Sequence, residues 1–136
     1  MTKYSDPFPG FAHPDNEGYT RIPNEFMEKE LSNIDSLAEL KVILYLMRHT
    51  WGYQEYMDSD TGEGFKWITT EEFIHGRWKK RGRHKKAKID DGTGLSDYGV
   101  RTGLKKAIEH GYILEDVNDQ DKARIRKSYA LKMKDP

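Results

Sequence analysis

Five polar side chains recur after Ser96 at spacings that a helix would bring to one face. They are Asp97, Tyr98, Arg101, Thr102 and Lys105. Together they offer hydrogen-bond donors, acceptors, a flat ring and positive charge, the groups that can contact base edges or phosphates. An ordinary amphipathic helix with a solvated polar face has the same pattern, so the face alone leaves both interpretations open.

The residues around this face predict the elements that position it. Ser96 is a suitable N-cap, and Asp97 places negative charge where the helix dipole favours it. Apolar residues recur at helical spacing on the opposite side, and Gly111 follows as a stop before the strand-like segment 112–114. The apolar set is Val100, Leu104, Ala107 and Ile108. A turn, a capped helix and a strand in this order are typical of a helix-turn-helix whose second helix enters a DNA groove.

The charge of the chain is unevenly distributed. Its formal net charge is zero, but residues 77–106 contain eleven basic residues against three acidic ones, a local charge of +8. The rest of the chain therefore carries −8. Such a molecule can orient in the field of a polyanion with its acidic side turned away.

Most of this positive charge lies in a run that separates two predicted helices. We expect the run to form a basic loop at about 77–92 that binds phosphates and becomes ordered on contact; the alternative is a solvated, flexible loop. Its candidate phosphate ligands are Lys79, Lys80, Arg81, Arg83, Lys85 and Lys86. Asp90 and Asp91, beside a glycine, predict a turn rather than a magnesium site.

Other elements follow from capping and periodicity. Asn24 is a candidate cap for a short helix, and Ser36 with Glu39 predicts a capping box for a helix to about Thr50. The apolar stripe expected on that second helix is Leu37, Leu40, Ile43, Leu44 and Met47. A short strand at 65–68 precedes a second capping box, Thr69 with Glu72, and a helix to about Gly76.

The C-terminal part predicts a hairpin. Strands at 112–117 and 124–133 are separated by the turn formers of 118–122. Arg124 and Arg126 lie on the second strand, where we expect them to bind the adjacent phosphate backbone. The fold class expected is α+β: a three-helix core, mainly α, with a small β-hairpin. Residues 1–17, rich in proline and glycine, predict an extended or mobile arm before a domain at 18–136.

Composition and missing motifs narrow the function classes. The 136 residues include no cysteine, which excludes disulfides, a thiolate zinc site and a cysteine nucleophile. We expect a cytoplasmic protein without membrane contact, because there is no long apolar run and no signal-type N-terminus. There is no phosphate-binding glycine loop, and the histidines lack metal-ligand spacing, so we expect neither an enzyme nor a cofactor. Segment 58–64 departs from a calcium loop at several ligand positions and predicts a surface loop.

The chain resembles winged-helix DNA-binding domains in 93–96, Val100, Leu104 and 111–113. Segments 18–26, 38–42 and 48–53 are similar to the N-terminal domain of phage replication protein O and related replication initiators. The resemblance implies binding of double-stranded DNA at a replication origin and, as a partner, a replicative helicase or helicase loader. It leaves two alternatives, a winged-helix transcription regulator and a winged helix that binds protein.

Two features depart from that family. Sixteen residues separate Gly76 from Thr93, where family members have a few. The positions after Ser96, often basic in winged-helix proteins, are Asp97, Tyr98 and Gly99. We therefore expect the helix to supply selectivity, through Arg101 with guanine and Asp97 with a cytosine amino group, and the basic run and wing to supply affinity. The target sequence and the oligomeric state stay open.

Overall fold

The computed structural model describes residues 6–13, 19–20, 22–49, 68–81, 85–88, 90–118 and 126–132. In these ranges helices combine with a small antiparallel sheet, as the sequence predicts for an α+β chain. The predicted calcium-like segment 58–64, the strand residues 65–67 and the hairpin turn 119–122 lie outside the described residues. Residues 6–13, within the predicted N-terminal arm, contain no helix or strand.

The first helical elements are short and lead into the longest buried helix. η1 (Phe26–Glu30) and η2 (Leu31–Asn33) precede α2 (Leu37–His49). Asn24 is itself helical, so the prediction that it caps this segment is wrong. Ser36 Oγ accepts from the Glu39 backbone N–H at 3.3 Å, one half of the predicted capping box.

The reciprocal half of that box is replaced by a tertiary contact. The Glu39 carboxylate is fully buried and lies 2.6 Å from His110 Nδ1, at the end of a different helix. Leu37, expected in the apolar stripe, is 65% exposed, whereas Val42 and Leu46 are fully buried. The buried face of α2 is therefore rotated from the predicted one, because the helix packs against both α4 (Asp97–Glu109) and β5 (Arg126–Leu131).

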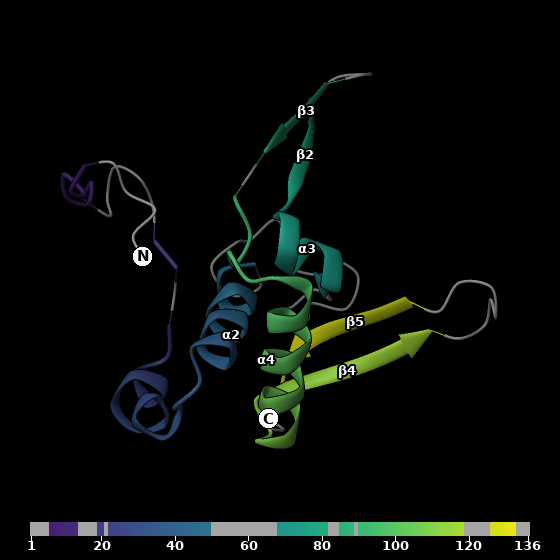
Figure 1. Cartoon of the computed structure of the whole chain (residues 1–136). Helices are drawn as coiled ribbons and strands as arrows, with labels where there is room; N and C mark the ends of the chain where they lie inside the picture. Colours follow the sequence, from purple (N-terminus) through teal and green to yellow (C-terminus); the bar gives the residue numbers. More distant parts are fainter. Residues whose placement is uncertain are drawn as a thin grey trace.

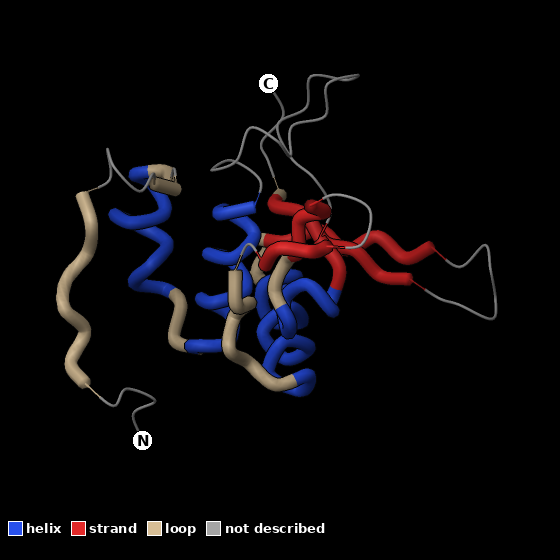
Figure 2. The backbone as a smooth tube through the Cα atoms, turned by 90° about the horizontal axis from the view of Figure 1, so that it is seen from above, coloured by secondary structure: helices blue, strands red, loops and turns tan. Residues whose placement is uncertain are grey.

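A three-stranded antiparallel sheet completes the core. Its order is β1 (Ile68–Thr69), β5 and β4 (Ile113–Asn118), so the strand before α3 (Thr70–His75) pairs with the last strand of the chain. Ile68 lies opposite Tyr129, and Ile113 opposite Leu131. The helices and the sheet share one core that contains Phe26, Val42, Ile43, Leu46, Ile68, Phe73, Val100, Leu104, Ala107, Ile113, Tyr129 and Leu131. Figure 2 shows the helices on one side of the strands.

The basic segment expected to be a loop instead contains two strands. β2 (Trp78–Arg81) and β3 (Lys85–Lys88) pair antiparallel as a separate ribbon, with Trp78 opposite Lys88 and Arg81 opposite Lys85. The sequence did not indicate it because neither strand has the apolar alternation of a half-buried strand. Figure 1 shows the ribbon projecting from the body beyond α3, while β4 and β5 extend in another direction.

Candidate nucleic-acid interface

Helix α4 begins where the sequence predicts, and its cap is formed locally. Ser96 Oγ accepts from the Gly99 backbone N–H at 3.1 Å, and Ser96 itself is extended. Thr93 fixes the preceding turn, since its hydroxyl donates to the Phe73 carbonyl at 2.8 Å. The start of α4 is therefore attached to α3 by backbone and hydroxyl hydrogen bonds.

The end of α4 is also as predicted. Gly111 has a φ of +85° and ends the helix. Its N–H donates to the Ile108 carbonyl at 3.1 Å, and the Tyr112 N–H donates to the Ala107 carbonyl at 2.9 Å. This pair of hydrogen bonds is the Schellman arrangement, in which glycine supplies the left-handed residue.

The predicted polar face of α4 is exposed. Asp97, Tyr98 and Lys105 are exposed, as is Arg101, and Thr102 is half-buried. The Thr102 hydroxyl donates to the Tyr98 carbonyl at 2.8 Å, so it is partly occupied within the helix. Arg101 Nε lies 3.0 Å from Asp97 Oδ2, one turn away. The guanidinium that was expected to read a base is therefore paired with the carboxylate that was expected to read another.

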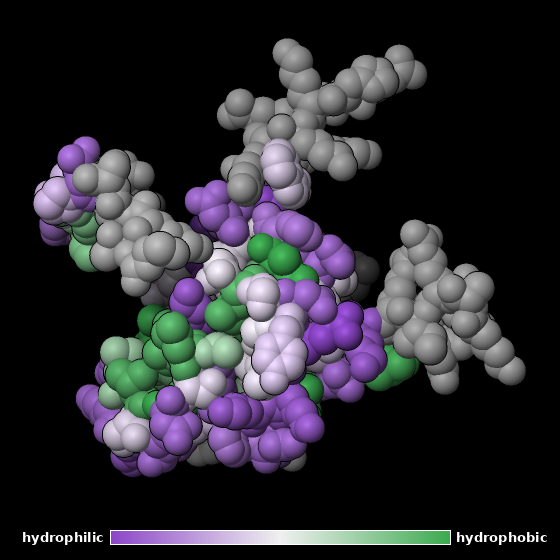
Figure 3. Space-filling view, viewed as in Figure 1, coloured by the Kyte–Doolittle hydropathy of each residue, from purple (hydrophilic) through white to green (hydrophobic). Residues whose placement is uncertain are grey.

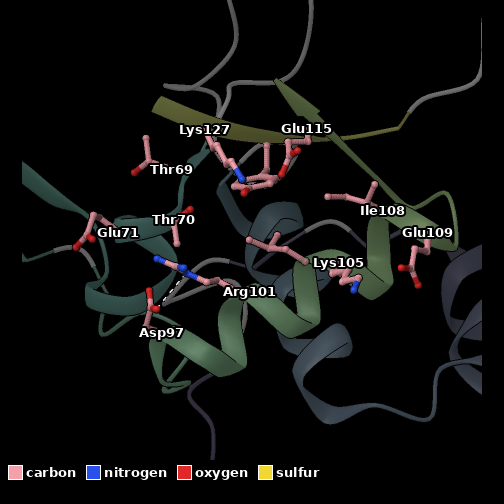
Figure 4. Close-up of a pocket in the computed structure, with 12 residues that line it drawn as sticks. Thr69, Thr70, Glu71, Asp97, Arg101, Lys105, Ile108, Glu109, Glu115 and Lys127 are labelled. Carbon is pink, nitrogen blue, oxygen red and sulfur yellow. Dashed lines mark ion pairs between the residues drawn. The ribbon is translucent and has the colours of Figure 1, made fainter. Parts of the chain in front are cut away.

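A groove runs along this face of α4. Figure 4 shows Arg101 and Lys105 of α4, Thr70 and Glu71 at the start of α3, and Lys127 of the hairpin around the same hollow. Its titratable lining, Tyr129 apart, is of mixed sign: Glu71, Asp97, Glu109 and Glu115 against Arg101, Lys105 and Lys127. Figure 3 shows hydrophilic residues over this part of the surface, between α4 and the β4–β5 hairpin.

The β4–β5 hairpin contributes a cation that the sequence interpretation placed elsewhere. Arg124 lies outside the described residues, and only the backbone of Arg126 is described, in β5. Lys127 is exposed and lines the groove. Its signal in the sequence was its position beside Tyr129 in the alternation of the strand, which brings both side chains to the groove side.

The basic ribbon places five of its six predicted phosphate ligands on paired strands. Lys79, Lys80 and Arg81 belong to β2, and Lys85 and Lys86 belong to β3, while Arg83 lies outside the described residues. Lys80 is opposite Lys86, and Arg81 is opposite Lys85. The strand register thus concentrates the basic positions that the sequence shows only as a run.

The two ends of the ribbon meet at a pair of glycines. Gly76 and Gly92 have φ angles of +86° and +80°. A Cβ on Gly76 would lie 2.1 Å from the Asp90 carbonyl oxygen, and one on Gly92 would lie 2.8 Å from the Ile74 carbonyl oxygen. Only residues without a side chain allow the backbone to close at this point.

Asp90 attaches this closure to α2, a contact that the sequence did not indicate. Its Oδ1 accepts from the Tyr45 hydroxyl at 3.0 Å and from the Gly92 N–H at 2.8 Å. Its Oδ2 lies 2.7 Å from Nε2 of the fully buried His49. Burial lowers the pKa of His49 against the opposing effect of Asp90, and burial with the Asp90 carboxylate raises the pKa of Tyr45. The predicted Asp90–Asp91 turn is present, with this added role.

Comparison with known proteins finds no match to a family model, a curated protein or a solved structure. In the described part of the chain no helix is long and apolar enough to cross a membrane. Among the same residues no group of three histidines or carboxylates could hold a metal ion.

Proposed function

We propose that this protein binds double-stranded DNA as a winged helix-turn-helix domain. The order of its elements supports the proposal: α2, β1, α3, α4 and then the β4–β5 hairpin, with β1 paired to β5. In that arrangement α4 is the recognition helix and β4–β5 is the wing. The resemblance to phage replication initiators favours replication initiation as the setting, with a replicative helicase or helicase loader as a second partner.

One observation carries the proposal. The exposed face of a capped helix lies between a hairpin and a ribbon in whose segment, 77–88, eight residues are basic and none is acidic. Cations on two projecting elements can bind the phosphates on either side of a groove, while the helix between them contacts base edges. Arg101 would pair with guanine after exchanging its contact with Asp97, and Tyr98, Thr102 and Lys105 would flank it.

The salt dependence of binding tests the proposal. If about six phosphates are neutralised, the logarithm of the association constant should fall with the logarithm of salt concentration at a slope near −5. Fluorescence anisotropy with a random duplex, and with duplexes selected from a random pool, measures this slope and any sequence preference. A slope near zero, or no binding to any duplex at low salt, would refute the DNA interpretation.

A second candidate function is favoured by the mixed charge of the α4 groove. Four carboxylates line it beside three cations, which suits a protein surface that carries both signs. Binding to heparin but to no duplex would support a winged helix that binds protein. A transcription regulator predicts instead a dimer on a palindromic site, which sedimentation of the complex would detect.

Replication initiation makes a further demand on partners. If the resemblance reflects function, the protein should be retained on origin DNA from its own genome together with the helicase or loader encoded there. Retention of the protein alone, on origin and non-origin duplexes equally, would leave DNA binding in place and remove the replication role.

A further inference from the structure

The ribbon leaves the body and returns to it at one point. Phe73 and Thr93, on either side of the insertion, are joined by a hydrogen bond from the Thr93 N–H to the Phe73 carbonyl at 2.9 Å. Because Gly76 and Gly92 also touch, the relation between α3 and α4 is set without the ribbon. The intervening residues are therefore an addition to the helix-turn-helix and not a slack connection within it.

Both ends of the ribbon are attached to buried or half-buried groups of the body. Arg77, directly before β2, places Nε 2.9 Å from Glu72 Oε2 of α3, and its side chain is only 12% exposed. Asp90, two residues after β3, contacts Tyr45 and His49 of α2. Attachments on two different helices restrict the direction in which the two strands project, so that little ordering remains to be done on binding.

The strands themselves have little to hold them together. Like charges directly opposite each other destabilise an antiparallel pair, and the register sets Lys80 against Lys86 and Arg81 against Lys85. A two-stranded hairpin without a packed face is marginal in water. A polyanion removes this repulsion, and regularly spaced phosphates are the polyanion that two parallel rows of cations fit.

We propose that the ribbon is a second duplex-binding arm, which holds the sugar-phosphate backbone beyond the N-terminal end of α4. Arg77 and Asp90 are its positioning residues. This inference rests on the proposed DNA binding and adds to it a site that extends to one side. Figure 1 shows the ribbon projecting past the end at which α4 begins, and the N-terminal residues of a recognition helix are those that contact the bases.

The length of the ribbon predicts how far the binding site extends. Strands of four residues span ~13 Å at ~3.3 Å per residue. At ~3.4 Å per base pair this corresponds to about four base pairs on one flank of the site. The footprint on a selected duplex should therefore be asymmetric about the bases that α4 contacts.

Two variants remove the arm in different ways. In the first, residues 79–87 are replaced by Asn-Gly, which joins Trp78 to Lys88 by a two-residue turn. In the second, the six basic residues of that segment become glutamine and the ribbon keeps its length. A control variant, Lys29→Gln with Lys132→Gln, removes two exposed lysines from η1 and from the end of β5. Circular dichroism of each variant establishes that it is folded, and the glutamine variant decides if the shortened one is not.

The expected result is a shallower salt slope, by up to about 5, and the loss of about four base pairs of footprint on one flank only. The control variant should change neither quantity. If the unaltered protein binds duplex DNA while both ribbon variants keep its slope and footprint, the arm is refuted and the proposed function stands. If the unaltered protein binds no duplex, the proposed function fails first.

Asp90→Ala tests the positioning role separately. Loss of the contacts to Tyr45, His49 and Gly92 should release the ribbon and shorten the footprint on its flank, whereas the contacts of α4 stay. Asp90→Asn keeps an acceptor for Tyr45 and Gly92 and should restore most of the flank. General destabilisation would weaken all contacts alike, so a variant with uniformly weaker protection, or with the full footprint, would refute the role of Asp90.

Discussion

Gly103 sits where α4 crosses α2, and its replacement by alanine should destabilise the protein although alanine favours helices. A Cβ on Gly103 would lie 2.6 Å from the Ala38 carbonyl oxygen and 3.1 Å from the Glu39 nitrogen. Both are backbone atoms at the start of α2, so no side-chain rotation can relieve the contact. The helices would have to separate by about 1 Å to restore ordinary packing distances.

Gly99 supplies a matched control one turn earlier in the same helix. A Cβ there would lie 3.3 Å from Cβ of Leu95, a half-buried residue in the preceding turn that can shift by a few tenths of an ångström. Alanine gains about 1 kcal/mol over glycine in a helix interior at either position. Only at Gly103 is this gain opposed by overpacking of a core.

The net effect follows from these terms. Overpacking costs about 3 kcal/mol at the upper end of its usual range, so Gly103→Ala should lose about 2 kcal/mol of unfolding free energy. For a domain of this size that corresponds to a fall in Tm of about 6–10 °C. Gly99→Ala should range from neutral to about 1 kcal/mol more stable.

Urea and thermal unfolding followed by circular dichroism measure both variants under one set of conditions. An unchanged urea m-value would show that the two midpoints can be compared as stabilities. If Gly103→Ala is as stable as Gly99→Ala, the close crossing of α2 and α4 is wrong, and with it the placement of α4 on the body.

Three further variants test other contacts. Burial lowers the pKa of His49, so the folded protein holds it neutral while the unfolded chain protonates it near pH ~6.5; the stability that this supplies is complete above that pH and is lost as pH falls through the folded value. The urea midpoint of the unaltered protein should therefore drop more between pH 7 and 5 than that of His49→Gln, and parallel profiles would contradict this. Asp97→Asn removes a negative charge from the α4 face and releases Arg101, so affinity for random duplex should rise two- to tenfold, within the range of ~1.4 kcal/mol per tenfold; unchanged or weaker binding would argue against a DNA-facing α4. Thr69→Ala removes the cap that accepts from the Glu72 N–H and should cost about 1 kcal/mol in urea unfolding, and an effect below a few tenths would mean that the box adds nothing to α3.

The local parts of the fold could be predicted well. The caps of α3 and α4, the glycine stop at Gly111 and the two strands of the C-terminal hairpin all follow from hydrogen bonds or turns within a few residues. The exposed side of α4 followed from its apolar period. Each of these features is decided by neighbours in the chain, which is the range over which pattern and propensity act.

The ribbon and the rotation of α2 could not be predicted in this way. Strands with like charges in register carry no apolar alternation, so the basic run indicated a loop. Glu39, which could have completed a capping box with Ser36, contacts His110 instead, 71 positions away along the chain. In both cases a partner that is remote in sequence overrides the local preference.

The candidate site divides along the same line. By itself the sequence determined which residues α4 exposes and that the neighbouring segment is strongly basic, because helical period and charge are properties of the chain. Only the tertiary structure decided that Arg101 is paired with Asp97 on an exposed face, that Lys127 joins the groove, and that Asp90 attaches the ribbon to α2. These depend on which side chains approach within 3 Å or so after packing, and that is set by the crossing of α2 and α4 at Gly103 and by the closure at Gly76 and Gly92.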